Sequence, residues 1–233
     1  MDTILTVLGA TLGVVVPALF AWLLLLGIAH APLDRGVKTR WTAALLGILG
    51  SWTAAVFALS IGGVLSYHEG DLIPRFVLAL VAPVVAGLAA LISPQYRAIV
   101  DHIPLSWLAG AQTFRLAGSS LLAVVALNIL PAAFVVGGFG DLLTGTLALI
   151  AGLALAMGSR IGGLLFWAYN AAGLIDLVNV AALLLFYYPI WSDASPSSAA
   201  AADFSLVMIP AVAAPLALLM HAYAIKRRVL GPA

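Results

Sequence analysis

Two ionisable side chains, Arg115 and Asp176, lie within long apolar stretches of the chain. A charge in hydrocarbon costs roughly 2.5–3.5 kcal/mol on insertion scales, so such a residue normally faces other helices and finds a partner. At about 1.5 Å per residue, the two side chains lie at depths that allow them to meet. We therefore predict that they pair inside a helical bundle, at a site that can bind or gate a solute or a proton.

Further polar residues follow the same faces at helical spacing. Gln112 lies three residues before Arg115, and Asn179 lies three residues after Asp176. Residues at such spacing are neighbours on a helix surface. Ordered by expected depth, the polar residues are His221, Gln112 and Asn170, Arg115, Asp176, Asn179 and Asp141. They predict a polar file across the bilayer, with Asp141 at the external mouth and His221 near the cytoplasmic end.

This polar file suggests a proton-coupled cycle. A substrate that binds Arg115 would release Asp176, and the free carboxylate could then take a proton from one side. Asp141 would collect protons at the outer mouth. His221 would release them inside, because histidine exchanges protons near neutral pH.

Structural roles are the alternatives at the same positions. The Arg115–Asp176 pair can simply fix the register of two helices. Asp141 follows the glycine-rich run 137–140, where it is interpreted as the N-cap of the next helix. His30, His102 and His221 are expected at the cytoplasmic face, facing water or a carbonyl group, and a metal site or a bis-histidine haem there is the alternative.

The composition is that of a membrane protein. Hydrophobic residues make up 64% of the chain and charged residues 8%, against roughly 45–50% and about 25% in soluble domains. The mean hydropathy is +1.16, which predicts one transmembrane domain over residues 1–233. The chain has no cysteine, so disulfides and thiolate metal sites are excluded. It has no basic patch that would suggest nucleic acid as a partner.

Apolar runs of the length that a helix needs to cross hydrocarbon recur along the whole chain. They cover residues 3–29, 42–66, 74–93, 105–134, 142–157, 162–188 and 204–225. The run 142–157 is short, and the alternatives are a start nearer Phe139 or a span that stops short of the full thickness. The fold class predicted from them is all-α, a polytopic membrane bundle of seven transmembrane helices.

Charge placement predicts the orientation of these spans. One set of connections carries Arg35, Lys38, Arg40, Arg97, Arg160, Lys226, Arg227 and Arg228. The other carries Glu69, Asp71, Asp141, Asp193 and Asp203, with Arg75 as its one basic residue. Short loops rich in Lys and Arg stay in the cytoplasm, so we expect the N-terminus outside and the C-terminus inside.

Several motifs resemble those of a family of uncharacterised multi-pass membrane proteins of bacteria. They are Gln112-x-x-Arg115-x-x-Gly118, Gly140-Asp141, Asn170-x-x-Gly173-x-x-Asp176, and Ile209-Pro210 followed by Pro215 and His221. The similarity covers roughly residues 104–228. It implies a bacterial inner (plasma) membrane setting and assigns no activity, substrate or cofactor.

Some function classes are excluded by what the sequence lacks. The only lysines, Lys38 and Lys226, lie at span ends, so a retinal Schiff base deep in a span is excluded. Hydrolase and Walker motifs are absent, which argues against proteolysis and ATP-driven transport. An enzyme is therefore not the favoured prediction.

The favoured prediction is a small transporter or channel with a buried polar site. The alternative is a membrane-embedded binding protein or enzyme for an amphiphile, haem or a metal, although no cofactor is expected. The expected partners are the lipid bilayer and a small solute, ion or amphiphile. The first three spans carry almost no buried polar residues, so they are expected to form scaffold or a contact between copies.

Overall fold

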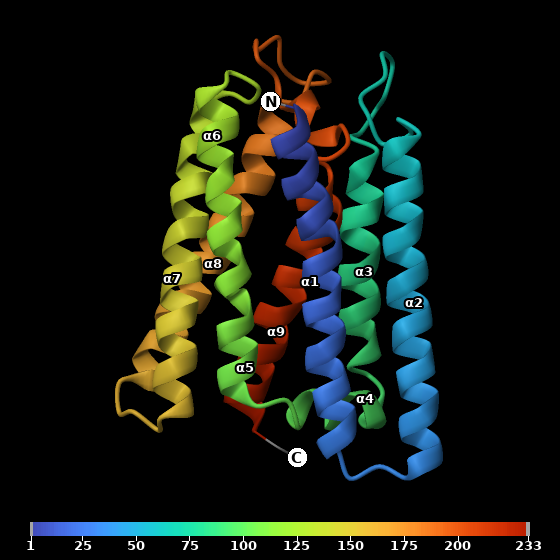
Figure 1. Cartoon of the computed structure of the whole chain (residues 1–233), viewed down its shortest axis with the longest axis vertical. Helices are drawn as coiled ribbons and strands as arrows, with labels where there is room; N and C mark the ends of the chain where they lie inside the picture. Colours follow the sequence, from blue (N-terminus) through green and yellow to red (C-terminus); the bar gives the residue numbers. More distant parts are fainter. Residues whose placement is uncertain (1, 232–233) are drawn as a thin grey trace.

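The computed structural model describes residues 2–231, and within that range the chain forms helices and no β-strand. The long helices lie side by side along the long axis, with the two chain termini at opposite ends (Figure 1). Six helical segments are long and apolar enough to cross a membrane, or seven if one bent pair is a single span. The prediction of an all-α bundle is confirmed for this part of the chain.

The helical elements alternate between long rods and short irregular segments. The α-helices are α1 Asp2–His30, α2 Arg35–Ile61, α3 Phe76–Ala90, α4 Pro94–Asp101, α5 Leu105–Ala111, α6 Leu121–Ala126, α7 Val135–Ala156, α8 Gly162–Phe186 and α9 Ala214–Leu230. The short segments are η1 Gln112–Ser120, η2 Ala132–Phe134 and η3 Ser198–Ala202, all 3₁₀, and η4 Ile209–Ala213, a π-helix. The predicted spans 3–29, 42–66 and 162–188 correspond to α1, α2 and α8.

The predicted span 105–134 is interrupted. Its main helical part, Leu105–Ala126, consists of α5, the 3₁₀ segment η1 and α6. A break that includes Pro131, which cannot donate a backbone hydrogen bond, separates it from η2. A 3₁₀ stretch inside a helix often marks a functional hinge or strain. The segment η1 carries Gln112 and Arg115, so the irregular part of this span is the part that holds the polar residues.

The predicted start of the span 142–157 is wrong, because the glycine-rich run 137–140 is helical. Helix α7 begins at Val135 and has 22 residues. A Cβ atom added at Gly137 would lie 2.6 Å from Val180 of α8, and one added at Gly138 would lie 2.6 Å from Leu122 of α6. These glycines therefore serve close helix packing within α7 rather than a turn before it.

Two other spans also depart from straight rods. Helix α3 is followed after a short break by α4, which turns away from it by 98°. The last span contains the π-helix η4 before α9, with Pro210 and Pro215 at or next to the junction. Of the apolar window in this last span 67% is buried, so η4 and α9 form the centre of the bundle.

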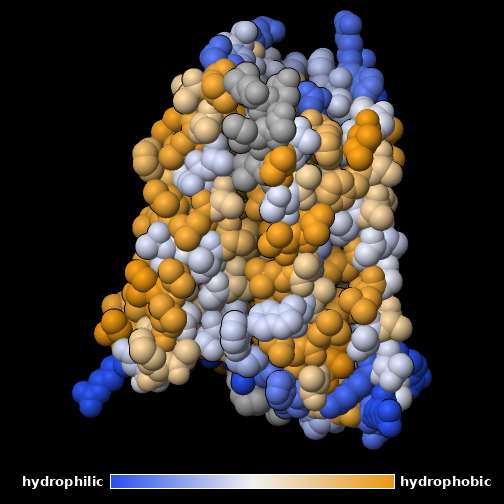
Figure 2. Space-filling view, in the orientation of Figure 1, coloured by the Kyte–Doolittle hydropathy of each residue, from blue (hydrophilic) through white to orange (hydrophobic). Residues whose placement is uncertain are grey.

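The surface has an apolar middle and polar ends. In Figure 2 hydrophobic residues cover most of the central band, while hydrophilic residues gather at the two ends. At one end Lys226 of α9 forms an ion pair with Asp101 of α4. At the other end Arg75 bonds Asp71 at 2.7 Å, and this hydrogen bond lowers the pKa of the Asp71 carboxyl. Such a surface is the one expected of helices that cross a bilayer.

Candidate functional site

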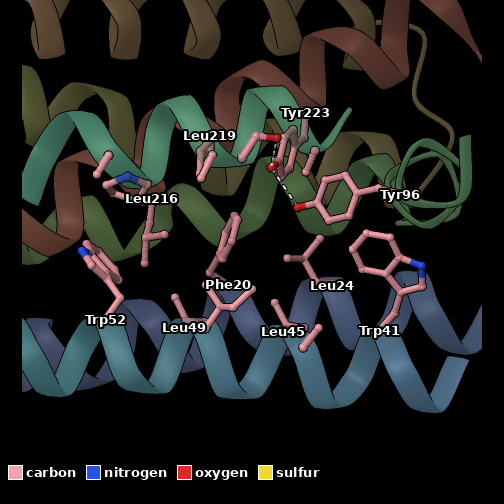
Figure 3. Close-up of a pocket in the computed structure, with 17 residues that line it drawn as sticks. Phe20, Leu24, Trp41, Leu45, Leu49, Trp52, Tyr96, Leu216, Leu219 and Tyr223 are labelled. Atoms are coloured by element: carbon pink, nitrogen blue, oxygen red, sulfur yellow. Dashed lines mark hydrogen bonds between the residues drawn. The ribbon is translucent and has the colours of Figure 1, made fainter. Parts of the chain in front are cut away.

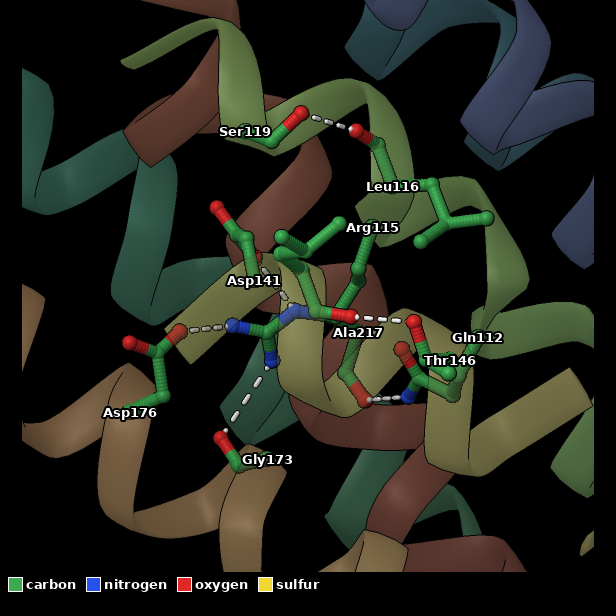
Figure 4. A network of polar contacts seen from close by, with 10 residues as sticks. Gln112, Arg115, Leu116, Ser119, Asp141, Thr146, Gly173, Asp176 and Ala217 are labelled. Atoms are coloured by element: carbon green, nitrogen blue, oxygen red, sulfur yellow. Dashed lines mark hydrogen bonds and ion pairs between the residues drawn. The ribbon is translucent and has the colours of Figure 1, made fainter. Parts of the chain in front are cut away.

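Arg115 is at the centre of a buried ion cluster (Figure 4). Its Nε donates to Oδ1 of Asp141 at 2.6 Å, and one terminal nitrogen pairs with the carboxylate of Asp176. The other terminal nitrogen donates to the carbonyl oxygen of Gly173 at 3.3 Å. We call Arg115, Asp141 and Asp176 the Arg115 triad. The pairing predicted for Arg115 and Asp176 is thus present, with Asp141 as a third member.

The triad joins three segments that are far apart in the sequence. Arg115 comes from η1, Asp141 from α7 and Asp176 from α8. The side chains of Arg115 and Asp176 are each 4% exposed, and that of Asp141 is 16% exposed. All three guanidinium nitrogens have acceptors, so the triad holds these segments together and satisfies the buried arginine.

Three glycines provide the space that the polar side chains occupy. A Cβ atom at Gly118 would overlap the Asp141 carboxylate, and one at Gly140 would overlap the Asp176 carboxylate. A Cβ atom at Gly173 would overlap the imidazole ring of His221. We call Gly118, Gly140 and Gly173 the glycine cradle.

The position predicted for Asp141 is wrong. Asp141 lies inside α7, six residues after its first residue, Val135, so it is not the N-cap of that helix. The residue before the helix is Phe134, which makes no side-chain cap hydrogen bond. Because the glycine run is helical, Asp141 lies in the triad and not at the outer mouth, where it was expected.

His221 is also part of the buried site. It is 0% exposed, and its Nδ1 lies 2.9 Å from Oδ1 of Asn170. Asn170 donates through Nδ2 to the carbonyl oxygen of Phe166 at 2.8 Å, so its Oδ1 is the atom that accepts from His221. The other ring nitrogen, Nε2, faces Gly173, whose carbonyl oxygen bonds Arg115. His221 was expected at the cytoplasmic end of the file, whereas here it adjoins the triad.

The two remaining predicted site residues lie in different surroundings. Gln112 is 0% exposed and donates through Nε2 to the carbonyl oxygen of Ala217 in α9 at 2.8 Å. Asn179 lies almost one helical turn beyond Asp176 in α8, and its Nδ2 is buried without a hydrogen-bond partner among the described residues. The contacts of the described residues connect Gln112 to α9 and leave Asn179 apart from the triad.

Several buried polar atoms near the triad have no partner within residues 2–231. They are Gln112 Oε1, Thr144 Oγ1 and His221 Nε2. Buried polar atoms are nearly always hydrogen-bonded to protein or ordered water. A cavity of about 50 Å³ borders Arg115, Asp141 and Asp176. This is enough space for a few water molecules beside polar groups.

Thr144 and the three cradle glycines were not among the predicted site residues. Thr144 is 0% exposed, and its methyl carbon would lie 2.9 Å from a Cβ atom at Gly173. The sequence did contain a signal for it, because Thr144 follows Asp141 by three residues and Gly140 by four, which places all three on one helix face. Gly118 and Gly140 were seen only as parts of motifs.

The histidines do not form a metal site in the described part of the chain. Nδ1 of His30 bonds the carbonyl oxygen of Leu26, and Nδ1 of His102 bonds that of Ala98. His221 is buried next to Asn170 and Gly173. Among residues 2–231 no group of three His, Cys, Asp or Glu side chains is arranged to hold a metal ion.

Comparison with known families gives one match. The family model described as "Domain of unknown function (DUF8737)" matches residues 72–229, which is more than half of the chain, so the chain belongs to this family. The matched range contains the whole Arg115 triad, the glycine cradle, Asn170 and His221. No curated protein and no solved structure matches the chain.

Proposed function

We propose that this member of the DUF8737 family is a small transporter or channel of a bacterial inner membrane, and that the Arg115 triad exchanges a proton during transport. The observation that carries the proposal is the composition of the triad, in which one guanidinium faces two largely buried carboxylates. Ionisable groups inside a membrane are expensive, and they mark ion pathways and proton relays.

The ratio of charges favours a proton or a small cation over an anion. With both carboxylates ionised, the triad has one negative charge in excess. Burial of an unbalanced charge is costly, and a proton on either carboxylate removes the excess. Each carboxylate is therefore a candidate for the exchanging group, and Arg115 supplies a fixed positive charge between them.

An anionic solute is less well supported as the ligand of Arg115. All three guanidinium nitrogens already have acceptors, in Asp141, Asp176 and Gly173. An incoming anion would have to displace a carboxylate that is already paired. This argues for Arg115 as a counter-charge in the cycle rather than as the residue that first binds substrate.

The surroundings of the triad support a hydrated route toward α9. The small cavity beside the triad is also bordered by Ala213, Ala214 and Ala217 of the last span. His221 lies one turn beyond Ala217, with its Nε2 buried against Gly173. Water in this cavity can bond the triad carboxylates, because a buried water typically makes about three hydrogen bonds, whereas His221 does not border the cavity.

Helix order and charge placement support an orientation with the N-terminus outside. The chain termini lie at opposite ends of the bundle (Figure 1). Arg35, Arg97 and Arg160 lie near the end of the bundle at which α9 terminates. Short connections rich in Lys and Arg stay in the cytoplasm.

The proposal is tested by proton movement into proteoliposomes that contain the wild type, Asp176→Asn or Asp193→Asn. Small cations, small anions and amphiphiles are supplied one at a time, and a pH-sensitive dye reports protons. We expect at least one solute to drive proton movement in the wild type. Asp176→Asn should lose it, because the variant leaves Arg115 and Asp141 balanced, with no excess negative charge for a proton to neutralise. Asp193 lies exposed in a loop, so Asp193→Asn is the matched control and should behave as the wild type.

Two results would contradict parts of this proposal. Equal solute and proton fluxes in the wild type and Asp176→Asn would remove Asp176 as the coupling group. No flux in any protein, with any solute, would favour the second candidate function.

That second candidate is a membrane-embedded binding protein or enzyme for an amphiphile or for a haem or metal cofactor. One observation favours its amphiphile form, a largely apolar cavity of about 330 Å³ that is separate from the triad. An absorption spectrum of the purified protein tests the haem form, since a Soret band would support haem.

A further inference from the structure

A large apolar cavity lies on the opposite side of α9 from the triad. It is formed by α1, α2, α3, α4 and α9 and has a volume of about 330 Å³ (Figure 3). Pockets for small molecules typically span 300–1,000 Å³. Side chains from α2 point into it from one side, and Leu216, Leu219, Tyr96 and Tyr223 point into it from the other. The cavity is thus large enough for part of a ligand, and it contains none of the triad residues.

The cavity opens sideways between α2 and α3. Helix α2 packs on α1 but has few contacts with α3, and only 11% of its apolar window is buried. Ile48 of α2 is 69% exposed, and Ala82 and Ala86 of α3 are also exposed, although all three residues line the cavity. In a bilayer this opening faces hydrocarbon, so a lipid chain can enter without crossing water.

The cavity has the shape of an extended chain. Trp41 and Trp52 of α2 mark its two ends, with Leu45 and Leu49 between them (Figure 3). At 1.5 Å per residue, the two tryptophans are about 16 Å apart along the helix axis. A cavity of this length along a membrane helix fits a hydrocarbon chain aligned with its neighbours in the bilayer better than it fits a compact solute.

Polar and basic residues lie next to residues that line the Trp41 end of the cavity, although the cavity lining itself is apolar. Trp41 Nε1 donates to Gln95 Oε1 at 3.0 Å, and the hydroxyl oxygens of Tyr96 and Tyr223 lie 2.9 Å apart. The exposed residues Arg40 and Arg97 adjoin Trp41 and Tyr96 in sequence. Among the described residues neither arginine forms a salt bridge. Clustered basic residues at a membrane surface attract anionic lipid headgroups.

We propose that this cavity binds one acyl chain of an anionic phospholipid, whose headgroup lies near Arg40 and Arg97 and whose chain extends toward Trp52. The inference rests on the membrane setting proposed above but not on transport. It assigns the α1–α2–α3 side of the bundle a binding function of its own, where scaffold or a contact between copies was expected.

The test uses the full chain in vesicles that contain a phosphatidylglycerol with a photoactivatable group in its acyl chain. Flotation with the vesicles is checked first, because a failure at that step contradicts the membrane setting rather than the lipid site. After irradiation, modified peptides are mapped by mass spectrometry. We expect labels on Leu45, Leu49 and Leu219 several-fold above those on the exposed residues Leu78 and Ile175, which do not line the cavity.

Matched variants separate the cavity from the general lipid-facing surface. Ala86→Phe fills the cavity and should reduce its labelling several-fold. Ala89→Phe adds the same ring on the same helix at an exposed residue that does not line the cavity, so it should leave labelling unchanged. Even labelling over all exposed apolar residues, or labelling unaffected by Ala86→Phe, would overturn the proposal. So would the absence of lipid adducts on the cavity residues.

Two further comparisons test the chemistry of the lipid. The ratio of labelling by phosphatidylglycerol to labelling by phosphatidylcholine should fall in the double variant Arg40→Gln/Arg97→Gln, and an unchanged ratio would overturn the proposed preference for an anionic headgroup.

The indole nitrogen of Trp52 is buried without a partner within residues 2–231. Trp52→Phe should leave labelling unchanged, because an acyl chain offers no acceptor there, and a loss would indicate an occupant with an oxygen at that end.

Discussion

Arg115 balances two carboxylates, so removal of the arginine and removal of one carboxylate should have unequal effects on stability. Arg115→Gln leaves Asp141 and Asp176 facing each other without a cation, and removal of one partner from a buried pair costs about 3–5 kcal/mol. Asp176→Asn leaves a charge-balanced pair of Arg115 and Asp141, whose Nε and Oδ1 atoms lie 2.6 Å apart in the wild type. We therefore expect Arg115→Gln to lower the thermal unfolding temperature in detergent much more than Asp176→Asn does.

The double variant Arg115→Gln/Asp176→Asn provides the internal control. It leaves one unpaired carboxylate instead of two, so it should be less destabilised than the sum of the two single variants. Residues within one salt-bridge network normally show such non-additivity. Additive effects would show that Arg115 and Asp176 do not interact. An Asp176→Asn variant less stable than Arg115→Gln would show that Asp141 does not share the charge of Arg115.

At the residue scale, the sequence predicted the pair but not its third member. Arg115 and Asp176 could be matched because each lies in an apolar span and needs a partner. Asp141 follows a run of glycines, a composition typical of turns as well as of close helix contacts. Only the packing of Gly137 against α8 and Gly138 against α6 decides between them. The depth of Asp141 depends on that choice, as does its role.

At the element scale, the glycine cradle lets helices carry polar side chains toward one another. A Gly→Ala change in an exposed helix interior normally stabilises a protein by about 0.5–1 kcal/mol. At Gly140 and Gly173 the added methyl group overlaps Asp176 and His221, respectively. We expect Gly140→Ala and Gly173→Ala to be destabilising instead, by about 1–3 kcal/mol as for other overpacked sites.

The control for this prediction is Gly50→Ala in α2. A Cβ atom at Gly50 would have no other atom within 4 Å, so this variant should be neutral or slightly stabilised. Thermal unfolding of the three variants in the same detergent makes the comparison. If Gly140→Ala and Gly50→Ala had the same unfolding temperature, the cradle would not constrain the triad.

The number of spans follows from hydropathy, whereas their irregularities do not. An apolar run shows that a segment can cross hydrocarbon, and α1, α2 and α8 were found in this way. Hydropathy does not report the local hydrogen-bond pattern, so the 3₁₀ segment η1 and the 98° turn from α3 to α4 were not predicted. The turn before α4 does have a local signal, because Ser93 caps α4 and Pro94 is its first residue, a pattern typical of a helix start. The segment η1 contains no proline that would mark it.

At the scale of the whole molecule, the bundle has two chemically different ends. The connections at residues 31–34 and 157–161 lie at the same end as the C-terminus of α9, and the connection at residues 187–208 lies at the other (Figure 1). Positively charged short loops remain in the cytoplasm during insertion. The end that carries Arg35, Arg160 and Lys226 is therefore expected to face the cytoplasm.

The absence of cysteine from the chain makes this orientation directly measurable. We expect Asp193→Cys to react with a membrane-impermeant maleimide in intact bacterial spheroplasts, because Asp193 lies exposed at the end assigned to the outside. Ser159→Cys, at an exposed position of the opposite end, should react only after lysis. The cysteine-free wild type sets the background. Labelling of Ser159→Cys but not Asp193→Cys in intact spheroplasts would reverse the orientation.

The acyl chain proposed between α2 and α3 would then have its headgroup in the outer leaflet, because Arg40 and Arg97 lie at the same end of the bundle as Ser159.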